Sequence, residues 1–131
     1  MTRVQLLLDT HVMLWALADS GKLPSEASDL IVDPRNTVRY SAASVWEIAI
    51  KSSLGRRDFR VDLRRLLKAA AETGFLELPI TAAHAARVAA LPDIHRDPFD
   101  RLLIAQALEE SAVLLTNDAP LAAYSKHVRL V

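Results

Sequence analysis

Cysteine is absent from this sequence, and glycine and aromatic residues are scarce. The missing thiols exclude disulfides, thiolate metal sites and a cysteine nucleophile, and they fit a reducing compartment. With only three glycines, the chain contains no glycine-rich loop of the kind that cradles nucleotide phosphates. Because aromatic side chains make up only 5% of the residues, leucine, alanine, valine and isoleucine are expected to form the core.

An excess of one charge and a long apolar run are also missing. The chain has 16 basic and 16 acidic residues, so its composition gives no sign of a nucleic-acid-binding protein. No apolar run reaches the roughly 18 residues that a membrane helix needs. The apolar stretch near the N-terminus is interrupted by Asp9 and lacks a small-residue cleavage site, which argues against a signal peptide. These absences predict a cytoplasmic protein with no membrane span.

The chain is expected to form one domain over residues 1–131, because no repeat, linker or low-complexity segment divides it. Apolar runs alternate with segments of helical spacing. Strands are expected at 3–8, 37–41, 75–79, 112–116 and 128–131, and helices at 10–19, 25–33, 42–55, 61–74, 81–91, 98–111 and 118–124. This alternation predicts an α/β fold with a mostly parallel central sheet covered by helices on both faces.

Two acidic residues follow predicted strands. Asp9 comes directly after the first strand, and Asp118 comes two residues after the strand at 112–116. Ligands of parallel sheets bind beyond the carboxyl ends of the strands, where both residues are expected to lie. Each could equally be the N-cap of the helix that follows, since strand-to-helix turns favour aspartate at that position.

Glu47 lies in a predicted helix that is apolar on nearly every side, with Val45, Trp46 and Ile48 as its neighbours. Such a helix is expected to be buried. A buried glutamate must be paired with a cation, protonated or bound to a metal. The alternative is a capping box from Ser44 to Glu47, which would require the helix to begin late.

Three aspartates surround the start of the predicted helix at 98–111. Asp97 directly precedes Pro98 and is expected to cap the helix. Asp100 lies one turn further in, where a negative charge also interacts favourably with the helix dipole. Asp93 is expected to be solvated.

Four carboxylates stand out from these segments: Asp9, Glu47, Asp100 and Asp118. Carboxylates within about 5 Å of each other repel by roughly 3 kcal/mol per pair at an effective dielectric near 20. A fold that gathers them needs a compensating cation, and such oxygen ligands suit Mg²⁺ or Mn²⁺. Because such an ion lowers the pKa of bound water and binds phosphoryl oxygens, the set suggests metal-dependent hydrolysis of a phosphodiester.

Four segments occur in order across nearly the whole chain: LLLDTHVMLWALAD, YSAASVWEIAIK, HRDPFDRLLIAQA and LLTNDAPL. Together they resemble the motifs of PIN-domain proteins of the type found as VapC toxins in toxin–antitoxin pairs. The resemblance implies a three-layer α/β/α fold and an endoribonuclease that hydrolyses RNA through a metal-activated water, with Mg²⁺ or Mn²⁺ as cofactor. It also implies a homodimer and an antitoxin protein that blocks the site.

The resemblance assigns the acidic residues by position. Asp9 matches the family's first acid, and Glu47 matches its helical glutamate. Asp100 matches the third acid, which precedes an alanine-rich helix, and Asp118 matches the fourth, the most variable of the set. The first three are expected to hold the metal, directly or through water. Asp118 is expected to support a second metal or to position the attacking water.

Thr116 and Asp97 are supporting residues in this scheme. Thr116 matches a small hydroxyl residue near the metal. Asp97 belongs to the HRDPFD form of the third motif, and it either ligates the metal or only caps its helix. His11 is expected to be structural or to lie behind the ligands, because nothing nearby completes a zinc site. Whether one or two metal ions bind stays open.

A basic segment follows Glu47. Residues 51–68 contain seven basic and two acidic residues, which makes them candidates for sequence-independent contacts with RNA phosphates. The RNA-binding candidates are Lys51, Arg56, Arg57, Arg60, Arg64 and Arg65. Two other interpretations stay open: a solvated helix face with local ion pairs, and a docking surface for an acidic antitoxin segment.

Two other functions compete with the ribonuclease. One is another Mg²⁺-dependent phosphohydrolase, such as a phosphatase of the haloacid dehalogenase type, but His11 stands where that chemistry needs a second aspartate. The other is a non-catalytic PIN-like binding module that acts through its partner. The presence of all four acids argues against this module. No motif names the RNA target.

Overall fold

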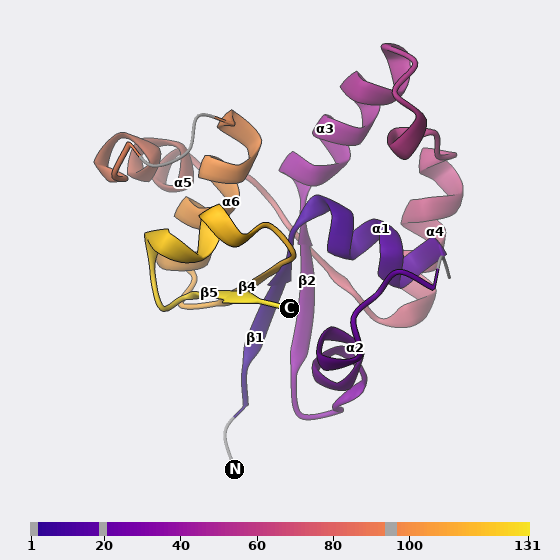
Figure 1. Ribbon diagram of the computed structural model, residues 1–131, viewed down its shortest axis with the longest axis horizontal. Coiled ribbons are helices and arrows are strands. Elements are labelled where there is room, and N and C mark those ends of the chain that lie inside the picture. Colours follow the sequence, from indigo (N-terminus) through magenta and orange to yellow (C-terminus); the bar gives the residue numbers. More distant parts are fainter. Residues whose placement is uncertain (1–2, 19–20, 94–96) are drawn as a thin grey trace.

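A computed structural model describes residues 3–18, 21–93 and 97–131. Its centre is a five-stranded sheet with the strand order β3-β2-β1-β4-β5 (Figure 1). The strands are β1 (Gln5–Leu8), β2 (Thr37–Ser41), β3 (Leu76–Leu78), β4 (Val113–Thr116) and β5 (Val128–Leu130). Every neighbouring pair is parallel. The α/β prediction is confirmed, and each strand lies within its predicted range.

The helices agree with the predicted segments in order, and differ at their ends. They are α1 (Thr10–Ala18), α2 (Ser25–Val32), α3 (Ala42–Ser53), α4 (Leu63–Thr73), α5 (Ala82–Arg87) and α6 (Pro98–Glu109), with 3₁₀ segments η1 (Arg57–Phe59), η2 (Val88–Ala90) and η3 (Ala119–Tyr124). The helix expected at 81–91 is thus divided into α5 and η2, and η1 was not predicted. Position 19 of the first predicted helix lies outside the described residues. In the described ranges, no helix has the length and apolar character needed to cross a membrane.

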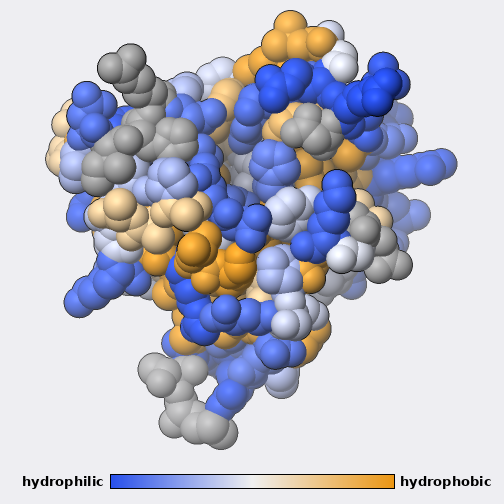
Figure 2. Space-filling model, viewed as in Figure 1, coloured by the Kyte–Doolittle hydropathy of each residue, from blue (hydrophilic) through white to orange (hydrophobic). Residues whose placement is uncertain are grey.

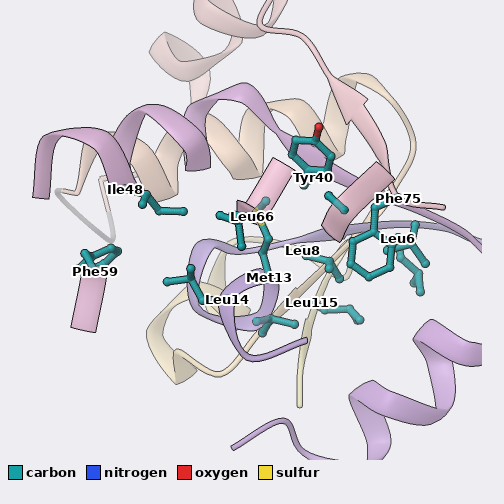
Figure 3. Close-up of a cluster of buried hydrophobic side chains, with 13 residues drawn as sticks. Leu6, Leu8, Met13, Leu14, Tyr40, Ile48, Phe59, Leu66, Phe75 and Leu115 are labelled. Carbon is teal, nitrogen blue, oxygen red and sulfur yellow. The ribbon is translucent and has the colours of Figure 1, made fainter. Parts of the chain in front are cut away.

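The sheet separates two hydrophobic clusters, because neighbouring side chains of a strand point to opposite faces. Leu6 and Leu8 of β1 belong to the cluster that includes residues of α1 and α4 (Figure 3). Leu7 points the other way and belongs to the cluster with Leu103 and Ile104 of α6. Figure 1 shows α1, α2 and α4 on one side of the sheet and α5 and α6 on the other. The predicted three-layer α/β/α arrangement is confirmed.

Helix α3 begins directly at the carboxyl end of β2 and is tied there to α6. Ser41, the last residue of β2, is the N-cap of α3 and accepts a hydrogen bond from the backbone N–H of Ala43 at 2.9 Å. Its hydroxyl donates to Oε1 of Gln106 in α6 at 2.5 Å. Ser41 and Gln106 are both fully buried. This hydrogen bond fixes the start of α3, which carries Glu47, against α6, which carries Asp100.

The link belongs to a buried polar network that the sequence pattern does not indicate. His84, only 1% exposed, forms a capping box with Thr81 at the start of α5. Nδ1 of His84 accepts a hydrogen bond from the backbone N–H of Thr81 at 3.0 Å, so the ring proton is on Nε2. Nε2 therefore donates to the Glu110 carboxylate, 2.9 Å away. The Gln106 side-chain amide lies 3.4 Å from His84 Nδ1 and donates to the Pro79 carbonyl at 3.3 Å. The network connects α5, α6 and the start of α3.

Candidate functional site

The carboxyl ends of the central strands carry the first predicted site residues. β1 and β4 are adjacent, and the backbone N–H of Asp9 donates to the Leu115 carbonyl at 3.0 Å. Asp118 follows β4 by two positions. Both aspartates line the same surface depression at this rim. The prediction that they share one edge of the sheet is therefore confirmed.

A pocket of about 140 Å³ at this rim collects side chains from four segments of the chain. Its lining consists of Asp9, Thr10, His11, Glu47, Lys51, Asp97, Asp100 and Asp118. The four predicted acids thus converge on one pocket, as the sequence predicted. Their catalytic and metal-binding roles remain predictions.

Asp9 is buried and held at both carboxylate oxygens. Its Oδ1 accepts from the backbone N–H of Val12 at 2.8 Å, which caps the first turn of α1. Its Oδ2 accepts from the hydroxyl of Thr116 at 2.6 Å. Thr116 in turn accepts from the backbone N–H of Asp118 at 3.0 Å. The Asp9 side chain thus caps α1 and also lines the pocket, so the capping interpretation does not exclude the predicted metal-binding role. Thr116 lies beside Asp9, where a supporting residue was predicted.

Burial raises the pKa of Asp9 above its ordinary value of 3.8. The negative charge of Glu47 raises this pKa further, while hydrogen bonds from Thr116 and Val12 and the nearby His11 lower it. The net effect disfavours the ionised carboxylate in the metal-free protein. A cation bound beside Asp9 would offset that cost.

The raised pKa of Asp9 gives a prediction for the metal-free protein. Between the ordinary pKa and the raised one, the folded state binds more protons than the unfolded state, so the free energy of unfolding falls as pH rises through this window. Asp9→Asn removes this titration. Urea melts in chelator, from mildly acid to neutral pH, are expected to show the variant gaining stability relative to wild type as pH rises. Parallel pH profiles would contradict the prediction.

Glu47 is only 4% exposed and is neutralised by a neighbour on its own helix. Its Oε1 accepts from the hydroxyl of Thr10 at 2.6 Å, and its Oε2 lies 2.5 Å from Nζ of Lys51. The capping box from Ser44 to Glu47 is wrong, because α3 begins at Ala42 with Ser41 as its cap. Of the possibilities left by the sequence, the structure shows pairing with a cation, the ammonium of Lys51.

The aspartates around the start of α6 have different environments. Asp97 caps the helix as expected, since its Oδ1 accepts from the backbone N–H groups of Phe99 and Asp100 at 2.9 and 3.0 Å. Asp100 lies in the first turn and reaches the pocket from there. Asp93 is exposed, as predicted. At the N-cap position of η3, Asp118 makes no side-chain capping bond, so the capping interpretation fails for this residue.

The donor chemistry of the pocket fits a hard divalent cation, because the carboxylates supply oxygen ligands. Within residues 3–18, 21–93 and 97–131, however, no group of three His, Asp or Glu side chains is arranged to hold a metal ion. Thr10 and Lys51 instead hold the Glu47 carboxylate. An ion bound by Glu47 would therefore compete with Lys51 for that carboxylate.

The structure separates Lys51 from the other predicted RNA-binding residues. Lys51 is partly buried and lines the pocket. The others are exposed on or near η1 and α4: Arg56, Arg57, Arg60, Arg64 and Arg65. Figure 2 shows hydrophobic atoms at the tip where α3 ends and hydrophilic atoms beside it, over the segment that follows. The RNA-binding role of these arginines stays a prediction.

Sequence reasoning missed Thr10 as a site residue, although it directly follows Asp9. Its side chain is buried and links Glu47 to the Ser44 hydroxyl, which lies 3.0 Å from the Thr10 hydroxyl. His11 lines the pocket and packs against the rings of Trp15 and Phe59 at 5.9 and 5.2 Å, as expected for a structural residue. Nothing in the sequence pattern predicted the contacts of Thr10 with Glu47 or of His11 with the two aromatic rings.

Comparisons with known proteins agree with this arrangement. The PIN domain family matches residues 6–126. Ribonuclease VapC22 of Mycobacterium tuberculosis is 32% identical over 126 residues, which is 95% of each chain. A chain of VapBC2 from Rickettsia felis, solved with a promoter DNA fragment, superimposes with a TM-score of 0.69 at 16% identity over 98% of both chains. A chain of a toxin–antitoxin complex from Klebsiella pneumoniae superimposes with a TM-score of 0.61 at 20% identity over 95% of both chains.

The two structural likenesses, at these low identities, show the fold alone. The family match and the identity to VapC22 each cover most of the chain. This chain therefore belongs to the PIN-domain family.

Proposed function

We propose that this protein is a Mg²⁺- or Mn²⁺-dependent endoribonuclease that acts in the cytoplasm as the toxin of a toxin–antitoxin pair. One observation carries the proposal: a PIN fold brings four acids from distant segments to one pocket, namely Asp9, Glu47, Asp100 and Asp118. The name of the relative VapC22 supports RNA as the substrate. The related complexes from other organisms support an antitoxin as a partner.

In the proposed reaction, Asp9, Glu47 and Asp100 hold the cation, directly or through water, and Asp118 supports a second metal or positions the attacking water. The surrounding side chains fix these acids. A bound divalent ion would supply a more acidic water and positive charge beside the scissile phosphate. Thr116 and the Val12 N–H set the orientation of Asp9. Thr10 sets the orientation of Glu47, and Asp97 fixes the helix turn that carries Asp100.

Two assembly partners complete the proposal. A second copy of the chain forms a homodimer, and an antitoxin protein covers the pocket to suppress cleavage. The exposed arginines on and near α4 offer phosphate contacts that add affinity without sequence information. Charge on that surface would also suit an acidic antitoxin segment.

The test is an endonuclease assay with the purified protein and total RNA. Internal cleavage is expected with Mg²⁺ or Mn²⁺, and it is expected to stop with excess chelator and to return when the ion is restored. Addition of the antitoxin partner is expected to stop cleavage as well. An uncleaved RNA pool in the presence of either ion would refute the proposal.

A second candidate is a non-catalytic PIN-like module that acts by binding. The observation in its favour is that Glu47 is already engaged by Lys51 and that no three described acidic or imidazole side chains stand ready for a metal. Such a module would bind RNA or its partner with no dependence on divalent ions. The chelator comparison separates the two candidates.

A further inference from the structure

Lys51 introduces a positive charge into an otherwise acidic pocket. Among the lining residues that the structure describes, it is the only lysine or arginine. Its Nζ lies 2.5 Å from the Glu47 carboxylate, and its side chain is 21% exposed. The arginines of the basic segment, by contrast, lie on the surface outside this lining. Lys51 thus occupies a different environment from the residues that follow it in the sequence.

The ammonium group of Lys51 lies over the face of an aromatic ring, that of Phe59. Nζ lies 4.8 Å from the centroid of the Phe59 ring, a distance at which a cation is attracted to the ring face. Phe59 is 1% exposed and lies at one end of a hydrophobic cluster, beside Ile48 (Figure 3). The turn η1 brings Phe59 back beneath α3. A buried ring and a buried carboxylate therefore fix the position of this cation.

This position still leaves Lys51 able to bind a ligand. A lysine ammonium has three N–H donors. In the described part of the chain, its one ion pair is with Glu47. Lys51 itself lines the pocket, together with the carboxylates. An incoming anion would find hydrogen-bond donors here.

An RNA phosphodiester is itself an anion and is repelled by a pocket of carboxylates. A single divalent ion cannot neutralise the five acidic side chains of the lining and also the substrate. The fixed cation at the pocket wall is the group best placed to receive a phosphate oxygen. An ion bound by Glu47 would compete with Lys51 for Oε2, while the Phe59 ring would still hold the ammonium at the pocket wall.

We infer that Lys51 is a catalytic residue: its ammonium contacts a non-bridging oxygen of the scissile phosphate and stabilises the negative charge that develops there. The inference rests on the proposed ribonuclease function and names a group for that reaction outside the carboxylate set. It distinguishes Lys51 from the exposed arginines, whose contacts would serve RNA affinity alone.

The test replaces Lys51 with methionine, which keeps an unbranched stem over the Phe59 ring and removes the charge. Lys51→Met is expected to lower kcat about 100-fold, as loss of a charge-stabilising group does, with a KM for RNA within a few fold of wild type. Titration with Mn²⁺, followed by electron paramagnetic resonance, is expected to show undiminished ion binding. Lys126→Met, at an exposed position, is the matched control and is expected to leave kcat and KM unchanged.

Two outcomes would overturn the inference. Cleavage by Lys51→Met at the wild-type rate is one, and loss of Mn²⁺ binding in step with cleavage is the other, because Lys51 would then only position Glu47. Lys51→Arg keeps the charge and is expected to recover at least about a tenth of the wild-type kcat. An arginine variant as slow as the methionine variant would also count against the inference.

Failure of the underlying function gives a different result. If the protein is not a metal-dependent ribonuclease, wild type and the Lys126 control do not cleave RNA in the same assay. If only the inference fails, wild type cleaves and Lys51→Met cleaves as fast, or loses the ion as well.

Discussion

Asp9→Asn is expected to lower the rate of metal-dependent RNA cleavage by at least about 100-fold. Asp9 is buried in the pocket and is held at one oxygen by the Val12 N–H and at the other by the Thr116 hydroxyl. Asparagine keeps the size of the side chain and its carbonyl acceptor, but it loses the negative charge that would hold a cation. The measurement is a single-turnover assay on a labelled RNA with Mn²⁺.

The control for Asp9→Asn is the stability of the same variant. Without metal, its free energy of unfolding at neutral pH is expected to equal or exceed that of wild type, because the cost of burying an ionised carboxylate is removed. A ligand at about 100 times its Kd stabilises a protein by about 2.7 kcal/mol, so Mn²⁺ is expected to raise the melting temperature of wild type alone. A stable variant that cleaves at the wild-type rate would contradict the role of Asp9.

Glu47→Gln is expected to lower the rate of RNA cleavage by a factor similar to that for Asp9→Asn. Unlike Asp9→Asn, it is also expected to destabilise the protein by about 1–3 kcal/mol. Glutamine can still accept the hydrogen bond from Thr10, but its amide N–H₂ then faces the ammonium of Lys51. The partly buried cation loses its anion. Chemical denaturation in chelator measures the loss of stability, and the RNA assay measures the loss of cleavage.

A double variant separates these two effects of Glu47. Glu47→Gln combined with Lys51→Met removes the stranded charge, so part of the lost stability is expected to return while cleavage stays absent. The difference from the sum of the single changes gives the coupling energy of the pair. Strict additivity of the two changes would show that the 2.5 Å ion pair does not contribute to stability.

The general placement of the site could be read from the sequence because it depends on topology. In a parallel sheet, residues that follow strands meet at one edge, so Asp9 and Asp118 were expected together. Glu47 was expected to be buried because its helix is apolar on most sides, and Asp97 was expected to cap α6. Each of these expectations needed only element order and the spacing of residue types.

What the sequence did not reveal depends on contacts between distant side chains. Lys51 lies one turn after Glu47 on α3, a spacing that is visible in the sequence, but the contact of its ammonium with Phe59 is not. That contact depends on η1, a short turn with no recognisable pattern that brings Phe59 beneath the lysine. The link from Ser41 to Gln106 joins positions 65 residues apart and is a matter of packing. The length of the helix at 81–91 was overestimated, because its alanine-rich sequence favours a helix and does not show where the hydrogen-bond pattern tightens to 3₁₀ at Val88.

Side chains from four segments line one pocket, which we propose to be a divalent-cation site. The most direct measurement is an anomalous difference map from crystals of the protein soaked in Mn²⁺. We predict one strong peak in the pocket, at about 2.0–2.2 Å from carboxylate oxygens, the range for small hard cations, with Asp9 and at least one of the other acids as ligands. A pocket without a peak at saturating Mn²⁺, or Mn²⁺ bound only elsewhere on the surface, would contradict the claim.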